Sequence, residues 1–232
     1  MTVAGSGKTI LWYVPHTTSH HIHLDACRPV SSSIIEQATI LCNEGLGLVA
    51  YYYFDFRDTA AKQDVRGLLS SLVVQLCAKS DPCYEILSHL YSKHDAGLRL
   101  PDDDALTQCL KNMLGLPGLP PIYIMVDALD ECPNSSGAPS SRELVLDLIE
   151  DLVELRLPNL HICITSRPEV DIQEFVAPLA SHSVSLQDEA GQKQDITDYI
   201  NSAVQADRKM RKWRAEDRQL VIDALTQRAD GM

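Results

Sequence analysis

The sequence is poor in aromatic residues and in positive charge, and it has no long apolar run. Phe, Trp and Tyr make up 6% of its 232 residues, which predicts an aliphatic core. Asp and Glu outnumber Lys and Arg and give a formal net charge of −12, whereas a nucleic-acid-binding surface needs clustered cations that face phosphates. No apolar run approaches the roughly 20 residues that cross a bilayer. We therefore expect no nucleic-acid partner and no membrane partner.

Pairing patterns are also missing among the cysteines. The chain has seven, and none of them forms a Cys-x-x-Cys pair: Cys27, Cys42, Cys77, Cys83, Cys109, Cys132 and Cys163. The N-terminus carries a glycine-rich motif in place of the basic patch and apolar core of a signal peptide. An odd, unpatterned set of cysteines favours reduced thiols. We therefore expect a cytoplasmic location.

Apolar residues make up 45% of the chain, enough for a substantial core, and they are grouped in short runs. Continuous apolar runs indicate strands that are buried on both faces, as in a parallel sheet covered by helices. Four runs predict such strands, at 48–54, 122–126, 160–165 and 183–186. Helical patterns lie between them at 34–43, 65–78 and 143–155. This alternation predicts an α/β fold with a mainly parallel sheet.

The composition changes near residue 188, where the chain becomes polar and helical. An amphipathic helix is predicted at 218–228. The basic run at 208–214 is interpreted as a solvated helix face. We expect a core domain at 1–187 and the start of a helical lid or second subdomain at 188–232.

The glycine-rich motif near the N-terminus is typical of a phosphate loop. It reads Gly5-Ser6-Gly7-Lys8-Thr9. In such a loop small residues let backbone N–H groups curl around phosphates, the lysine reaches the terminal phosphates, and the Thr hydroxyl binds Mg²⁺. The first glycine of the general pattern is replaced by Thr2.

The residues after this loop do not read as one continuous helix. Residues 9–12 could begin a helix, but Pro15 and the polar stretch 16–23 stop it, and the helical pattern resumes only at Ser33. The stretch 11–30 therefore reads as an insertion. Two origins stay open, a genuine surface loop and an artefact of the gene model.

A second motif lies at the end of the predicted strand 122–126, which is followed by Asp127, Asp130 and Glu131. A carboxylate at that position can hold the hydration shell of Mg²⁺, and one three or four residues later can orient or deprotonate a water molecule. The next strand is followed by Arg167, which can sense a terminal phosphate. Ligands of open α/β sheets bind at the carboxyl ends of the strands, so these residues should share one edge. The alternative is a solvated acidic turn beside a surface arginine.

Taken together, these motifs resemble a known family. The resemblance depends on the phosphate loop, on 52–58 (Tyr-Tyr-Phe-Asp-Phe-Arg-Asp), on 127–132 (Asp-Ala-Leu-Asp-Glu-Cys) and on 165–168 (Thr-Ser-Arg-Pro). In this order they resemble the NACHT domain of STAND-class signalling NTPases. More narrowly, they resemble the nephrocystin-3-like N-terminal domain that is common in fungal NACHT–ankyrin proteins.

The resemblance implies a P-loop NTPase three-layer sandwich that acts as a switch. Such a domain binds ATP or GTP with Mg²⁺, hydrolyses it slowly, and signals through self-association or effector domains. It implies that Gly5–Thr9 bind phosphate, that Thr9 and Asp127 hold Mg²⁺, that Asp130 or Glu131 polarises water, and that Arg167 is a sensor. The box at 52–58 is expected to be structural.

Three departures from the family pattern lead to a competing hypothesis. Only residues 1–3 could supply the strand that precedes the loop in the middle of the sheet, so this first strand is expected to be largely missing. The insertion interrupts the following helix, and the chain ends where the family continues into further domains, so we expect a truncated domain. The alternative is a non-catalytic remnant or protein-interaction module that does not bind nucleotide. A small-molecule kinase is disfavoured, since no lid motif with clustered arginines is present.

Overall fold

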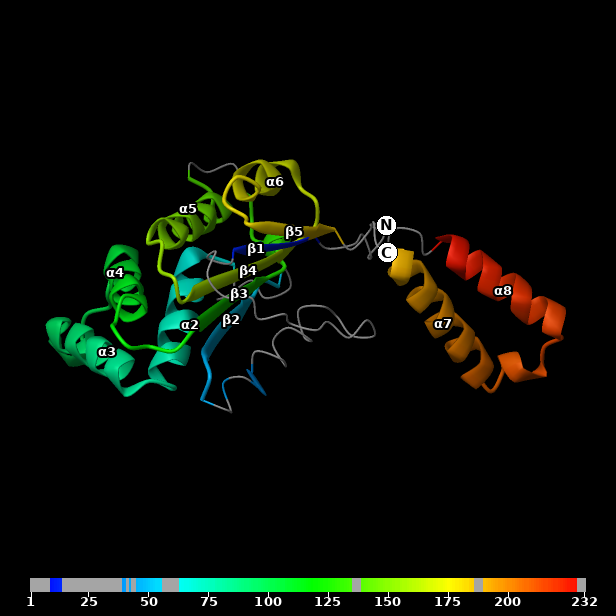
Figure 1. Cartoon of the computed structure of the whole chain (residues 1–232), viewed down its shortest axis with the longest axis horizontal. Helices are drawn as coiled ribbons and strands as arrows, with labels where there is room; N and C mark the ends of the chain where they lie inside the picture. Colours follow the sequence, from blue (N-terminus) through cyan, green and yellow to red (C-terminus); the bar gives the residue numbers. More distant parts are fainter. Residues whose placement is uncertain are drawn as a thin grey trace.

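The computed structural model describes residues 9–13, 39–40, 42, 45–55, 63–134, 139–185 and 190–228. Its sheet has the strand order β2-β3-β4-β1-β5 (Figure 1). The strands are β1 (Thr9–Tyr13), β2 (Leu48–Tyr53), β3 (Ile122–Asp127), β4 (Leu160–Ser166) and β5 (His182–Ser185). The helices are α2 (Val65–Cys77), α3 (Asp81–Lys93), α4 (Asp103–Leu114), α5 (Ser141–Glu154), α6 (Val170–Val176), α7 (Ala190–Ala206) and α8 (Ala215–Arg228). Three short 3-10 turns complete the list: η1 (Asp95–Gly97), η2 (Leu129–Glu131) and η3 (Met210–Lys212).

Three neighbouring strands form the parallel part of the sheet. β3 pairs in parallel with β2 on one side and with β4 on the other, so that Ile122 lies between Leu48 and Leu160. Every residue of β4 is buried, as are most residues of β3. The continuous apolar runs therefore marked these three strands correctly, and the mixed α/β fold with parallel strands is confirmed.

β1 is the main departure from the expected sheet. It lies between β4 and β5 and runs antiparallel to both, with Thr9 opposite Ser166 and Ser185. Residues 9–12, which the sequence allowed to begin a helix, form a strand instead. Ile, Trp and Tyr favour strands, and a strand in this place gives hydrogen-bond partners to the backbones on both sides. The predicted insertion at 11–30 thus overlaps β1 at residues 11–13, and its remainder lies outside the described residues.

Helices α2 and α5 confirm the two helical patterns predicted nearest to the parallel strands. The Asp64 side chain caps α2 by accepting a hydrogen bond from the Gly67 N–H at 2.7 Å. Ser140 and Glu143 form a reciprocal capping box at the start of α5. α2 packs on β2 and on α5, and α5 contacts α6, so these helices form one layer beside the sheet (Figure 1).

The structure describes this helical layer and the sheet, but not the third layer of the expected sandwich. The helix predicted at 34–43 lies outside the described residues except for Thr39, Ile40 and Cys42, which are helical. α3, α4 and α6 were not predicted. α4 begins where the Asp102 carboxylate accepts a hydrogen bond from the Ala105 N–H at 2.8 Å, and it buries one apolar face.

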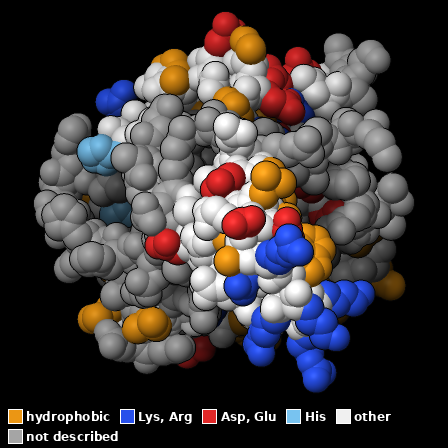
Figure 2. All heavy atoms as spheres, turned by 90° about the vertical axis from the view of Figure 1, so that its right-hand side faces the viewer, with side chains coloured by type: hydrophobic (Ala, Val, Ile, Leu, Met, Phe, Trp, Pro, Cys, Tyr) orange, Lys and Arg blue, Asp and Glu red, His pale blue; other side chains and the backbone are white. Residues whose placement is uncertain are grey.

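Helices α7 and α8 pack on each other through a small cluster of their own, formed by Ile200, Val204 and Ile222. The basic run at 208–214 lies in and around η3, which joins the two helices, so its assignment to a helix face is wrong. Asp207 explains the turn, because its carboxylate accepts hydrogen bonds from the Lys209 and Met210 N–H groups at 2.7 and 3.0 Å. Figure 2 views the molecule from the side on which α7 and α8 lie in Figure 1, and it shows Lys and Arg side chains gathered there.

Two further sequence expectations concern the cysteines and the membrane-spanning helices. In the part of the chain that the structure describes, the cysteines at 42, 77, 83, 109, 132 and 163 are free thiols. Among the described helices, none is both long enough and apolar enough to cross a bilayer.

Candidate functional site

The carboxyl ends of β3 and β4 are joined by a short hydrogen-bonded chain. The Thr165 hydroxyl donates to the Asp127 carboxylate and accepts from the Ala128 N–H at 3.1 Å. The carbonyl of Asp127 accepts from the Phe54 N–H at 3.0 Å, which adds the end of β2. Asp127 is therefore oriented by both neighbouring strands at the edge where the sequence predicts it.

A residue with a left-handed backbone conformation then turns the chain sharply at this edge. Ala128 has φ 56° and ψ 47° although it is not glycine, and it is 3% exposed. Non-glycine residues held in this region carry backbone strain, which occurs often at functional sites. The turn η2 follows, closed by a hydrogen bond from the Glu131 N–H to the Ala128 carbonyl at 2.8 Å. The left-handed conformation of Ala128 thus brings the two acidic residues of η2 back to the sheet edge.

Asp130 and Arg167 form a close pair across this edge. One carboxylate oxygen of Asp130 accepts from the Arg167 backbone N–H at 2.9 Å, and the other lies 3.3 Å from the Arg167 Nε. The Asp130 side chain is 3% exposed and that of Arg167 is 42% exposed. This ion pair joins the turn after β3 to the turn after β4, and it engages the Asp130 carboxylate.

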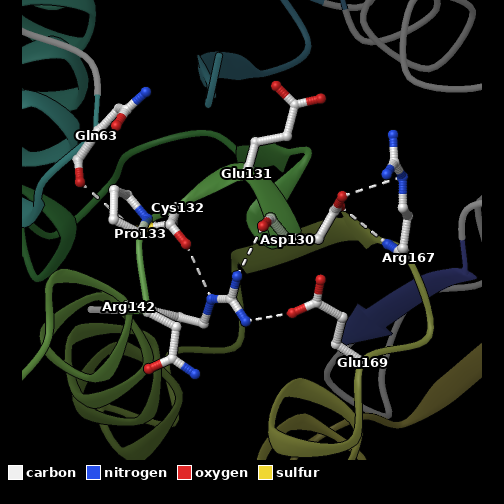
Figure 3. A pocket seen from close by; sticks show the side chains of 9 residues that line it. Gln63, Asp130, Glu131, Cys132, Pro133, Arg142, Arg167 and Glu169 are labelled. Carbon is white, nitrogen blue, oxygen red and sulfur yellow. Dashed lines mark hydrogen bonds and ion pairs between the residues drawn. The ribbon is translucent and has the colours of Figure 1, made fainter. Parts of the chain in front are cut away.

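A pocket of about 360 Å³ opens beside this pair. It is lined by Gln63, Asp130, Glu131, Cys132, Pro133, Asn134, Arg142, Arg167 and Glu169. In Figure 3 the Arg142 guanidinium lies between the two turns, whereas the Glu131 carboxylate points away from it. The lining is thus mainly charged and polar, and it takes its charges from the ends of β3 and β4 and from the start of α5.

Burial and neighbouring charges shift the pKa of several groups in and near the pocket. Burial disfavours the charge on Arg142, but hydrogen bonds and charge attraction from Asp171 and Glu169 outweigh it and raise its pKa above the ordinary arginine value. Burial raises the pKa of the Cys132 thiol to about 12. The pKa of Tyr53 is also raised, by burial first and then by the negative charge of Asp127. The arginine therefore stays charged, and the thiol stays protonated near neutral pH.

The predicted site residues fall into two groups. Asp127, Asp130, Glu131 and Arg167 come together at one edge of the sheet. Thr9 begins β1 at the same edge, because its register partner is Ser166, the residue before Arg167. Gly5, Ser6, Gly7 and Lys8 lie outside the described residues.

Sequence reasoning missed two residues that hold this edge together, Thr165 and Arg142. Thr165 stands in the Thr-Ser-Arg-Pro box, where its position before Arg167 was the available signal. Arg142 is a charged residue in the first turn of an otherwise amphipathic helix and is 5% exposed. Nothing in its local sequence distinguishes it from a surface arginine.

In a comparison with protein families, the chain matches a family described as "Nephrocystin 3, N-terminal". The match covers residues 3–167, well over half of the chain. This range contains the glycine-rich motif at Gly5–Thr9, the acidic turn after β3, and Arg167. Searches of curated proteins and of solved structures gave no match. The resemblance found in the sequence is thereby confirmed, and the chain belongs to the nephrocystin 3 N-terminal family.

Proposed function

We propose that this chain is a nucleotide-binding regulatory domain of the STAND type, a NACHT-like switch that binds ATP or GTP with Mg²⁺ and hydrolyses it slowly. One observation carries the proposal. The beginning of β1, which directly follows Lys8, lies at the same sheet edge as the acidic turn after β3 and Arg167 after β4. An edge that gathers oxygen ligands and a cation suits a magnesium–phosphate ligand.

The sheet order also supports a P-loop fold. In this class the strand that carries the phosphate loop lies between the strands of the acidic motif and the last strand. β1 occupies that place between β4 and β5, although it runs in the opposite direction and follows the loop instead of preceding it. Thr9, the last residue of the glycine-rich motif, thus begins a strand at that place in the sheet.

We assign the roles as follows. Backbone N–H groups of Gly5–Lys8 and the Lys8 ammonium would hold the phosphates, and Thr9 with Asp127 would hold Mg²⁺. Mg²⁺, when bound, would neutralise charge on the terminal phosphates. Among the described residues, no group of three or more His, Cys, Asp or Glu side chains forms a ready cation site. The nucleotide's own oxygens would therefore complete the metal coordination, as is usual for Mg²⁺.

The geometry favours Glu131 over Asp130 as the residue that orients water. Asp130 has a nearly inaccessible side chain and is engaged by Arg167. Glu131 follows it in the same turn and lines the pocket. Both residues line the pocket, but a carboxylate that orients water must be accessible to it, and the Asp130 side chain is nearly inaccessible.

Titration with fluorescent ATP and GTP analogues in the presence of Mg²⁺ tests the proposal. We expect micromolar binding by the wild type and loss of binding in Lys8→Ala. Lys93→Ala is the matched control, because it removes the same charge from the exposed end of α3. Equal binding by wild type and Lys8→Ala contradicts the proposal.

A second candidate function is a protein-interaction module without nucleotide binding. The observation that favours it is the strand at residues 9–13, since a phosphate loop normally opens into a helix whose dipole faces the phosphates. This candidate predicts that neither Mg-ATP nor Mg-GTP raises the melting temperature. A clear rise with either nucleotide excludes it.

A further inference from the structure

Arg142 is a buried cation to which the proposed function assigns no role. Its side chain is 7% exposed, and it extends from the first turn of α5. A buried charge is strongly unfavourable unless ion pairs and hydrogen bonds compensate it. The partners of this guanidinium therefore indicate what it holds in place.

Two of its partners are backbone carbonyls in and next to the acidic turn. The Arg142 Nη2 donates to the carbonyl of Asp130 at 2.7 Å, and its Nε donates to the carbonyl of Cys132 at 3.0 Å. These residues stand immediately before and after Glu131. The guanidinium thus fixes the backbone of Glu131 from both sides without touching its side chain (Figure 3).

Two other partners belong to the segment after β4. The Arg142 Nη1 pairs with the Glu169 carboxylate and lies 3.0 Å from that of Asp171. Glu169 is two residues from Arg167, and its own N–H donates to the Arg167 carbonyl at 2.8 Å. One planar group therefore spans the turn after β3 and the turn after β4.

The Asp130–Arg167 pair joins the same two turns on the other side of η2. With both links in place, neither Glu131 nor Arg167 can move without disturbing the other turn. A lysine could not replace this arrangement, because its single ammonium lacks the planar fork of donors that reaches two carbonyls and a carboxylate together.

We propose that Arg142 is a positioning residue that holds Glu131 and the Arg167 turn in one fixed arrangement. The mechanical part, that it ties the two turns together, depends only on the contacts above. The functional part, that this arrangement serves hydrolysis, rests on the proposed nucleotide function. A simpler role in starting α5 is already met by the Ser140–Glu143 capping box.

The test compares Arg142→Gln and Arg142→Lys with Arg66→Gln in the full chain. Arg66 is a matched control, because its guanidinium also joins a carboxylate and a carbonyl, at 2.6 Å to Asp103 and 2.7 Å to Pro101, but outside the pocket. Hydrogen exchange without nucleotide measures the mechanical part. Nucleotide affinity and single-turnover hydrolysis with Mg-ATP and Mg-GTP measure the functional part.

We expect both Arg142 variants to speed amide exchange in 128–133 and in 167–171 together, and Arg66→Gln to leave both segments unchanged. Hydrolysis should fall by about tenfold or more while the nucleotide Kd changes by less than about threefold, the signature of a group needed only for the chemical step. Arg142→Lys should not restore the rate.

If Arg142→Gln does not fold, Arg142→Lys and Glu169→Gln decide the question, since Glu169 is 42% exposed. Its substitution weakens only the link to the second turn, by removing one of two carboxylates, and leaves both carbonyl bonds to the first turn. Unchanged exchange in either turn overturns the proposal, whatever the nucleotide assays show. Full hydrolysis by folded Arg142 variants also overturns it. If the wild type binds no nucleotide, the proposed function fails, and the exchange result still decides whether Arg142 ties the turns together.

Discussion

At the scale of single residues, Thr165 decides how Asp127 is presented. Its hydroxyl is buried between two strands, donating to the Asp127 carboxylate and accepting from the Ala128 N–H. Both bonds hold the point where β3 ends and the strained turn begins. The same hydroxyl therefore connects fold stability with the geometry of the candidate magnesium ligand.

Replacing Thr165 with valine keeps the side-chain shape and removes only the hydroxyl. We expect a loss of about 1–3 kcal/mol in the free energy of unfolding, because the buried Ala128 N–H is left without this acceptor. Urea denaturation followed by circular dichroism measures the loss.

The control for this change is Thr226→Val in α8. The Thr226 hydroxyl is buried and has no hydrogen-bond partner within the described part of the chain. Its removal should be neutral or stabilising. A Thr165→Val protein as stable as the wild type would show that the hydroxyl bridge is unimportant.

At the scale of elements, β2 shows how the sheet protects an edge. β2 is one of the two edge strands of the described sheet. The Gln75 amide of α2 accepts from the Tyr51 N–H at 3.1 Å and donates to the Tyr51 carbonyl at 2.7 Å. Lys79 donates to the Val49 carbonyl at 2.5 Å. Side chains of α2 and of Lys79, which follows it, thus occupy backbone groups that another strand would otherwise pair with.

We therefore expect Gln75→Met to increase self-association on heating. The substitution keeps a long helix-forming side chain but leaves both Tyr51 backbone groups open, with a stability loss of about 0.5–1.5 kcal/mol for each hydrogen bond lost. Light scattering during a thermal ramp measures aggregation. Gln108→Met on α4 is the control, since that amide bonds only to the Asn112 side chain among the contacts that the structure gives it. Identical aggregation by the two variants contradicts the edge-protection argument.

The elements that the sequence predicts well are those whose own residues determine whether they form a helix or a strand. β3 and β4 are continuous apolar runs between breakers, and α5 carries its start signal in Ser140 and Glu143. β1 could not be predicted in the same way. Residues 9–13 are short and ambiguous, and what makes them a strand is the place between β4 and β5, which no local pattern reveals.

The same distinction applies to the candidate site, where some residues were predictable from the sequence and others were not. Asp127, Glu131 and Arg167 were predictable, because the ends of parallel strands meet at one edge. The pairing of Asp130 with Arg167 was not, since the sequence gives no side-chain direction. Arg142 escaped notice because its carboxylate partners lie 27 and 29 residues further along the chain.

At the scale of the whole molecule, two clusters of described apolar residues are separate from each other. The larger joins the sheet with α2 to α6, and the smaller consists of Ile200, Val204 and Ile222 with Met210 and Val221 packed against it. Since the buried area of the smaller cluster is limited, it contributes less stability than the larger one. Regions with few buried contacts unfold locally before the rest.

Ile222→Ala should therefore loosen α7 and α8 without loosening the sheet. Ile-to-Ala changes in a packed core remove about 2–5 kcal/mol, which is enough to open a small helical pair. We expect faster amide exchange throughout α7 and α8 and unchanged exchange in β3 and β4. Ile124→Ala in β3 is the matched control, and it should speed exchange across the larger cluster. Faster exchange in β3 of the Ile222→Ala protein would mean that the two clusters unfold as one cooperative unit, and that the helical pair is part of the core domain in energetic terms.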